Sequence, residues 1–178
     1  MTTLHAPSPN NLKNAITYSD NVYFARSALN IGKDNLFKYY KNLKIGEKTP
    51  FELALNRSQY INKNQKANDQ LIADSGYGQG QILMNPLQLA SIYSSFVNEG
   101  SIYQPHIVQG KTKTWIKNIF SKETTKTIKE DLINVIADEK GTGHSIYHDN
   151  VTLAGKTGTA EIKLSKEDAT GTELGWMA

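Results

Sequence analysis

The tetrapeptide Lys156-Thr157-Gly158-Thr159 combines groups that can recognise an anion. A lysine ammonium and two hydroxyls can hold a carboxylate through charge-assisted hydrogen bonds. Gly158 has no side chain, so the backbone of an extended ligand can lie against the chain there. A backbone N–H just beyond it can stabilise a developing oxyanion. The alternative to an anion site is an ordinary strand edge with a solvated lysine, because a motif of four residues often occurs by chance.

A second polar cluster, Ser19-Asp20-Asn21, lies far upstream between two segments of helical spacing. These residue types favour caps and turns, since their short side chains compete for nearby backbone groups. A common turn is therefore one interpretation of the tripeptide. The functional interpretation makes the Ser19 hydroxyl a proton relay. The Asn21 amide would then orient a neighbouring lysine and the amide of a substrate.

The secondary-structure elements that must position these clusters can be predicted from the spacing of the hydrophobic residues and from the residues that begin or end helices. Residues 1–10 predict coil, 46–70 a long loop, and the glycine-dense segment 74–81 a turn. Asn85-Pro86 is typical of a helix start, and Ser121 predicts a helix cap. Helices are expected over 11–18, 22–32, 36–46, 86–100 and from Ser121 to Gly141, and short strands over 102–109 and 114–120.

Strand-like runs at 151–163 and 174–178 flank a polar turn, which predicts a β-hairpin that carries Lys156. The sequence stops inside the second run. Because an unpaired buried strand edge is unfavourable, we expect truncation at the C-terminus. No internal repeat or linker divides the sequence, so we expect one partial domain over residues 1–178.

Both clusters belong to a known set of three motifs, S-x-x-K, S-D-N and K-T-G, found in serine enzymes that react with penicillin. The sequence around the two motifs resembles the class B penicillin-binding proteins, and among them the low-affinity, β-lactam-resistance-type transpeptidases of Gram-positive bacteria. The resemblance covers about Asn11 to Trp176. The stretches that carry it are AITYSDNVYFA (15–25), LIADSGYGQGQ (71–81), NPLQLA (85–90) and LAGKTGTAE (153–161).

The resemblance implies a mixed α/β domain of the serine β-lactamase and D,D-peptidase fold, with an antiparallel sheet and helices on both faces, here incomplete. It implies a D,D-transpeptidase that forms an acyl-enzyme with the D-Ala-D-Ala end of a peptidoglycan stem peptide and passes the acyl group to an amine. β-Lactams imitate that dipeptide. The parent protein would act at the outer face of the cell membrane, held by an N-terminal anchor that this sequence does not contain.

The resemblance also implies roles for individual residues. Ser19 would relay a proton to the leaving amine, and Asn21 would hold the catalytic lysine of the S-x-x-K motif. Lys156 and Thr157 would engage the substrate carboxylate. The remaining positions are Gly158, which the substrate passes, Thr159, whose N–H would serve the oxyanion hole, and Gln79, which would line the cleft.

The sequence departs from the family pattern in one respect: no serine is followed by lysine three positions later. Covalent catalysis needs a nucleophile within hydrogen-bond reach of a base. We therefore expect the chain alone to be inactive in acylation. We also expect poor stability or aggregation, because the missing segments would leave apolar surfaces uncovered.

Other kinds of site are disfavoured. The net charge of +3 is spread along 178 residues without a basic block, which argues against nucleic acid. Cysteine is absent, and no signal peptide or apolar span is present. The glycines at 76, 78 and 80 lack the Gly-Lys-Ser/Thr of a phosphate loop. His144 and His148 are interpreted as a surface pair rather than metal ligands, so no metal or cofactor is expected.

Three alternatives to a transpeptidase stay open. A β-lactam hydrolase or carboxypeptidase would share the motifs but use water as acceptor. A β-lactam sensor domain would bind covalently without turnover. The third alternative is a fragment with no activity. The residue sequence upstream of position 1 would separate these alternatives.

Overall fold

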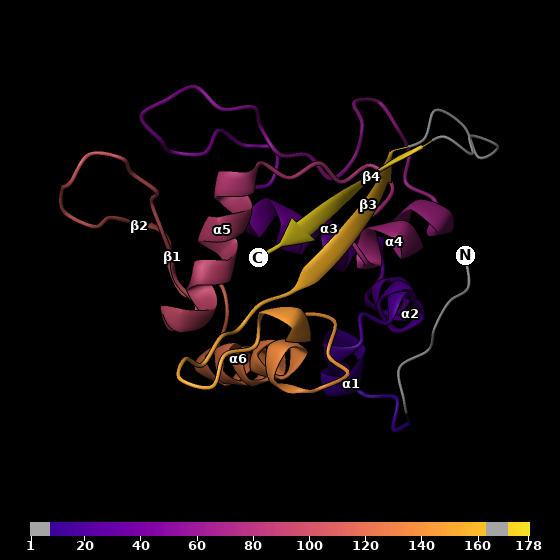
Figure 1. The fold of residues 1–178 in the computed structure, drawn as a ribbon. Helices are drawn as coiled ribbons and strands as arrows, with labels where there is room; N and C mark the ends of the chain where they lie inside the picture. Colours follow the sequence, from indigo (N-terminus) through magenta and orange to yellow (C-terminus); the bar gives the residue numbers. More distant parts are fainter. Residues whose placement is uncertain (1–7, 163–170) are drawn as a thin grey trace. The chain divides into compact units, whose positions relative to one another are not determined.

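The computed structural model describes residues 8–162 and 171–178 of the chain. By contacts the chain divides into two compact units (Figure 1). The first contains the residues up to Asp20 and those from Asp131 onward, and the second contains Asn21–Glu130. The prediction of one partial domain over 1–178 stays a prediction.

The first unit begins with helix α1, Leu12–Thr17. The side-chain oxygen of Asn11 accepts a hydrogen bond from the Asn14 N–H at 2.9 Å, which satisfies one of the free donors of the first turn. Ala15, Ile16 and Thr17 are buried. This short helix therefore packs through its last turn, immediately before Ser19.

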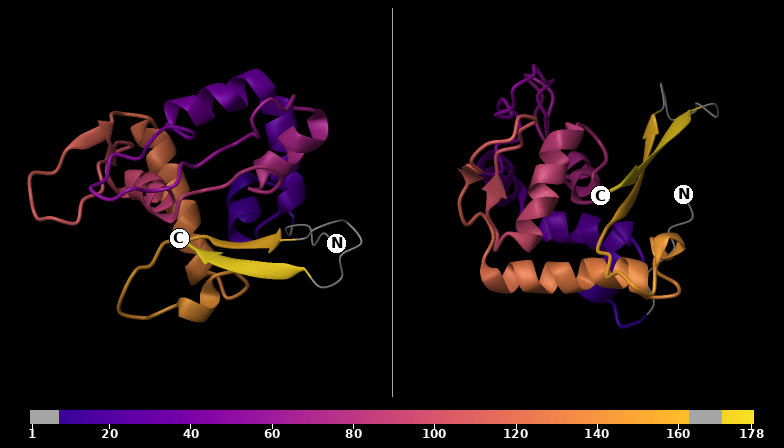
Figure 2. Two further views of the ribbon diagram at one scale, coloured as in Figure 1. Left: turned by 90° about the horizontal axis from the view of Figure 1, so that it is seen from above. Right: turned by 60° about the vertical axis from the view of Figure 1, so that its left-hand side comes forward.

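Helix α6, Lys122–Ala137, contributes its C-terminal half to the first unit. The carbonyls of its last turn need partners from outside the helix. The Gly143 N–H donates to the Val135 oxygen at 3.0 Å, and His144 Nδ1 lies 3.0 Å from the Ile136 oxygen. The short 3₁₀ helix η2, His144–Ile146, thereby lies beside the end of α6 (Figure 2).

Strands β3, Thr157–Ile162, and β4, Thr172–Met177, pair antiparallel in the first unit (Figure 1). Thr157 is opposite Met177, and Gly158 is opposite Trp176. Opposed side chains share a face, so Leu174 and Trp176 lie on the same face of the ladder as Gly158. Both apolar side chains are exposed, Leu174 at 43% and Trp176 at 36%.

The second unit contains helices α2 (Asn21–Ile31), α3 (Lys33–Asn42) and α4 (Asp69–Gly76). A Cβ on Gly76 would collide with the Phe24 carbonyl oxygen and come within 2.8 Å of the Ala28 Cβ. The absence of a side chain at Gly76 is what lets α4 approach α2 this closely. The rings of Phe37, Tyr40 and Tyr60 pack against one another beside these helices.

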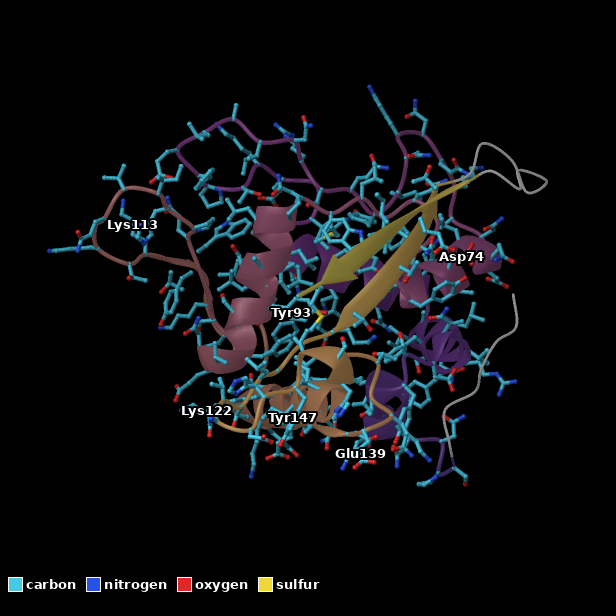
Figure 3. The ribbon with its side chains drawn as sticks, viewed as in Figure 1. Asp74, Tyr93, Lys113, Lys122, Glu139 and Tyr147 are labelled. Atoms are coloured by element: carbon cyan, nitrogen blue, oxygen red, sulfur yellow. The ribbon has the colours of Figure 1, made fainter. Side chains whose placement is uncertain are left out.

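The rest of the second unit is built on helix α5, Pro86–Ser94, which Asn85 caps by accepting from the Leu87 N–H at 2.9 Å. It continues into the 3₁₀ helix η1, Ser95–Val97. Strands β1, Ile102–Tyr103, and β2, Thr114–Ile116, form a small antiparallel pair. Figure 3 labels Lys113 in the loop before β2 and Lys122, which forms an exposed ion pair with Glu99 at 3.0 Å.

The structure confirms the five helices expected from the sequence and the antiparallel pairing of the two strands after the lysine motif, whereas most of the polar turn expected between them lies outside the described residues. Three expectations were wrong in detail. The strands expected over 102–109 and 114–120 extend only over Ile102–Tyr103 and Thr114–Ile116. The glycine-dense segment 74–81 was interpreted only as a turn, but Asp69–Gly76 is helix α4. The strand expected from Val151 begins at Thr157. Lys156 still pairs with Ala178, but the preceding Gly155 donates to the Leu132 oxygen of α6 instead.

The close contact at Gly76 generates a stability prediction. Gly76→Ala should lower the free energy of unfolding by about 1–3 kcal/mol, because the new methyl group forces α2 and α4 apart. Gly175→Ala is the matched control, since a Cβ at Gly175 meets nothing within 4 Å. Urea denaturation of both variants measures the difference, and equal midpoints would contradict the packing argument.

Candidate active site

Ser19 is held in an unusual backbone conformation at the C-terminal end of α1. Its φ is 59°, in the left-handed region where residues other than glycine are strained. The Asp20 N–H donates to the Ala15 oxygen at 2.9 Å, and the Ser19 N–H to the Ile16 oxygen at 3.4 Å. This pair of bonds is the Schellman motif, whose left-handed position is usually glycine. The site therefore carries strain that glycine would relieve.

Lys156 reaches Ser19 across 137 positions of sequence. Its Nζ donates to Ser19 Oγ at 2.8 Å and to the carbonyl oxygen of Thr157 at 2.9 Å. Both residues belong to the first unit. The two motifs that sequence analysis singled out are thus joined by a direct side-chain hydrogen bond.

The backbone of Lys156 is fixed on both sides. Its N–H donates to the Ala178 oxygen at 2.8 Å, and the Ala178 N–H donates back at 3.1 Å, which extends the β3–β4 ladder by one pair. The preceding residue, Gly155, donates to the Leu132 oxygen of α6 at 3.1 Å. A Cβ on Gly155 would come within 2.8 Å of the Ala178 oxygen, so only glycine fits this junction without a shift.

Burial lowers the pKa of Lys156 from 10.5 to about 8. Taking an ammonium away from water disfavours its charged form, which is the direction observed. A lysine with this pKa gains and loses a proton within reach of physiological pH. It can therefore act in proton transfer as well as in anion binding.

Thr157 and Gly158 follow on β3. The Thr157 hydroxyl donates to Thr142 Oγ1 at 2.7 Å. A Cβ on Gly158 would lie 3.5 Å from the Trp176 Cβ, which is ordinary van der Waals contact. Packing within the ladder therefore does not require glycine at 158. Thr159 is exposed on the same strand.

Asn21 and Gln79 belong to the second unit. Asn21 is the first residue of α2. Gln79 follows the end of α4, where its backbone N–H donates to the backbone carbonyl oxygen of Asp74 at 2.9 Å. Asp74, labelled in Figure 3, also accepts from the Tyr77 hydroxyl at 2.8 Å. The membership of Asn21 and Gln79 in the site stays a prediction.

Sequence analysis missed Thr142. The segment Gly141-Thr142-Gly143 predicted only the end of a helix, yet the Thr142 N–H donates to the Thr17 oxygen at 3.2 Å while its hydroxyl accepts from Thr157. Two glycines enclosing a polar residue next to a helix end were the available signal, since such glycines often mark a close backbone approach.

The family model of the penicillin-binding protein transpeptidase domain matches residues 2–178. The chain belongs to this family. It is 41% identical over 169 residues to penicillin-binding protein 3 of Bacillus subtilis, a match that covers 93% of this chain and 25% of that protein. It is 27% identical to the peptidoglycan D,D-transpeptidase MrdA of Haemophilus influenzae, over 88% of this chain and 27% of the relative. The chain thus spans about a quarter of the length of these two curated relatives.

The solved structures show the same fold. A chain in the complex between penicillin-binding protein PBP2 and MreC from Helicobacter pylori superposes with a TM-score of 0.75 at 27% identity. That match covers 85% of this chain and 31% of the other. The chain therefore has the transpeptidase fold of mixed helices and small antiparallel sheets, over part of the domain.

Other features of the described residues lie apart from Ser19 and Lys156. In the described residues, no group of three or more His, Cys, Asp or Glu side chains could hold a metal ion. His144 is part-buried rather than on the surface as expected, and its ring stacks on that of Tyr147, which Figure 3 labels. No helix within 8–162 or 171–178 is long and apolar enough to cross a bilayer. A cavity of about 310 Å³ lies between α6 and residues 147–153, and Ser19 and Lys156 are not among its lining residues.

The strain at Ser19 can be measured with two substitutions that both remove the hydroxyl. Ser19→Gly should be more stable than Ser19→Ala by about 1 kcal/mol, because only glycine adopts the left-handed backbone without strain. Urea denaturation of the two variants gives the difference. A Ser19→Ala variant as stable as Ser19→Gly would show that the backbone at this position is unstrained.

Proposed function

We propose that this chain forms the carboxylate-binding and proton-relay part of a peptidoglycan D,D-transpeptidase. Its substrate would be the D-Ala-D-Ala terminus of a stem peptide, and β-lactams would bind as mimics of that dipeptide. The observation that carries the proposal is the 2.8 Å hydrogen bond from Lys156 Nζ to Ser19 Oγ. It joins an anion-binding group to a hydroxyl that can pass on a proton.

Lys156 and Thr157 hold the substrate carboxylate in this mechanism. The ammonium supplies charge, and the hydroxyl supplies a directed hydrogen bond. Since Lys156 is partly buried, the carboxylate meets a cation that is poorly solvated and ready for a partner. Gly158 leaves the face of β3 open, and its packing within the ladder gives no other reason for glycine.

Proton delivery to the leaving amine uses the same hydrogen bond. When the C–N bond breaks, the Ser19 hydroxyl gives its proton to the amine and takes one from Lys156, which becomes neutral. A lysine pKa of about 8 makes this transfer cost little near neutral pH. The strained backbone at Ser19 fixes the direction of the hydroxyl.

The remaining roles complete the proposal. The Thr159 N–H serves the oxyanion hole, Asn21 orients the lysine of the S-x-x-K motif, and Gln79 lines the cleft. The serine nucleophile would come from a segment outside these 178 residues, because no serine here is followed by lysine three positions later. The proposal includes action at the outer face of the membrane and the low β-lactam affinity that the sequence resemblance implies.

Anion binding by Lys156 predicts a characteristic pH dependence. We expect N-acetyl-D-alanyl-D-alanine to bind more tightly than its C-terminal amide at pH 7. Above pH 8 the affinity for the acid should fall by about tenfold per pH unit, since the free lysine loses its charge while the ligand stays ionised. NMR titration of the chain from pH 6 to 10 measures this.

The controls for this titration are Lys156→Met and Lys129→Met. Lys129 is an exposed lysine of α6, so its loss should leave the titration unchanged. Lys156→Met should abolish the preference for the acid. Equal binding of the acid and the amide by the wild-type chain would refute the proposed function.

The absence of an S-x-x-K serine generates a second prediction. The chain alone should give no fluorescent-penicillin band that survives denaturing electrophoresis, because no activated nucleophile is present to form the acyl bond. A full transpeptidase that contains all three motifs is the positive control. A stable labelled band on the 178-residue chain would show that one of its own side chains is acylated, and the assignment of the nucleophile would be wrong.

A further inference from the structure

The turn Gly141-Thr142-Gly143 is fixed tightly on the end of α6. The Gly141 N–H donates to the Asp138 oxygen at 2.8 Å, and the Gly143 N–H donates to the Val135 oxygen at 3.0 Å. A Cβ on Gly141 would collide with that same Val135 oxygen. Thr142 is therefore the one residue of this turn with a side chain, and the glycines on both sides of it are fixed by backbone hydrogen bonds.

Thr142 contacts both segments that carry the motifs, through two different groups. Its backbone N–H donates to the carbonyl oxygen of Thr17 at 3.2 Å, two positions before Ser19. Its hydroxyl oxygen lies 2.7 Å from the hydroxyl oxygen of Thr157, the residue after Lys156. All of these residues belong to the first unit.

We propose that Thr142 is a positioning residue, whose hydroxyl orients the Thr157 hydroxyl toward the substrate carboxylate. This inference rests on the proposed function, because it concerns the same anion site. It assigns to Thr142 a role that acts only through Thr157 and not by contact with the substrate.

The role follows from the number of hydrogen bonds that each threonine hydroxyl can donate and accept. A threonine hydroxyl has one hydrogen to donate and two lone pairs that accept. In the chain without ligand, Thr157 gives its hydrogen to Thr142. A carboxylate only accepts, so the pair must reverse when the anion arrives: Thr142 donates to Thr157, and the Thr157 hydrogen turns to the carboxylate. Both hydroxyls must rotate for this, the observed hydrogen bond is replaced by its reverse, and no covalent bond breaks.

The alternative is that Thr142 only supports the fold. The two contacts separate these roles, because Thr142→Val keeps the backbone bond to Thr17 and removes only the hydroxyl. Thr142 is exposed, so the change buries no unpaired polar group. A positioning role predicts an effect on an anionic ligand alone, whereas a structural role predicts an effect on stability and on both ligands.

The experiment is an NMR titration of the 178-residue chain at pH 7 with N-acetyl-D-alanyl-D-alanine and with its C-terminal amide. Thr142→Val should weaken binding of the acid about five- to tenfold, the loss of the one neutral hydrogen bond that orients the Thr157 hydroxyl, and leave the amide unchanged. Thr142→Ser should stay within about twofold of wild type. Thr172→Val, at an exposed threonine of β4, is the matched control and should have no effect.

A double-substitution cycle identifies the route of the effect. If Thr142 acts through Thr157, then Thr142→Val should cost nothing further in a Thr157→Val background. Additive losses would mean that Thr142 acts independently, and they would overturn the proposal. So would an equal loss for the acid and the amide, or no loss for either.

Failure of the proposed function has a different result. A wild-type chain that binds the acid no better than the amide lacks the anion site, and both proposals are then wrong. If Thr142→Val and a second hydroxyl-free variant, Thr142→Ala, both lose the dispersed spectrum of the folded chain while Thr142→Ser keeps it, the hydroxyl is structural and the positioning role is overturned.

Discussion

The first unit depends on close backbone-to-backbone contacts between the last turns of α6 and the segments that follow this helix. Gly141 and Gly143 let the chain fold back over the helix end, and the Gly155 N–H reaches the Leu132 oxygen from the approach to β3. The Gly143 N–H also donates to the Val135 oxygen, one of the terminal carbonyls that lack a partner within the helix. A side chain at Gly141 or Gly155 would displace the segment that it belongs to. The position of Lys156 is therefore a consequence of residues that do no chemistry themselves.

The site combines two unfavourable local states that the surrounding contacts maintain. Ser19 has a left-handed backbone without being glycine, and Lys156 is an amine taken partly out of water. The two hydrogen bonds of the Schellman motif maintain the left-handed backbone of Ser19. The hydrogen bonds from Lys156 Nζ to Ser19 Oγ and to the Thr157 oxygen offset the cost of burying the amine. Such strain is typical of sites where geometry matters more than stability. The residues that hold them in place, above all Thr142, are then as informative as the motif residues.

Local signals were sufficient for most of the fold. Asn85-Pro86 starts α5, and the Ser121 hydroxyl accepts from the Thr124 N–H at 3.0 Å, as a helix cap should. Helix α4 was missed because Gly76 is there for its contact with α2, a reason invisible in the local sequence. The bond between Lys156 and Ser19 spans 137 positions, so the local sequence could not predict it, and the resemblance indicated only that both motifs belong to one site. The Thr142–Thr157 contact had no such guide, since it depends on where a turn and a strand meet.

The lowered pKa of Lys156 has a consequence outside transpeptidation. With a pKa of about 8, roughly a fifth of its amine is uncharged at pH 7.4, against about a thousandth for an ordinary lysine. The uncharged amine is the form that attacks activated esters and aldehydes. Among the 18 lysines of this chain, it is therefore the natural attachment point for a covalent reporter. A dye placed there would sit directly beside the serine of the other motif.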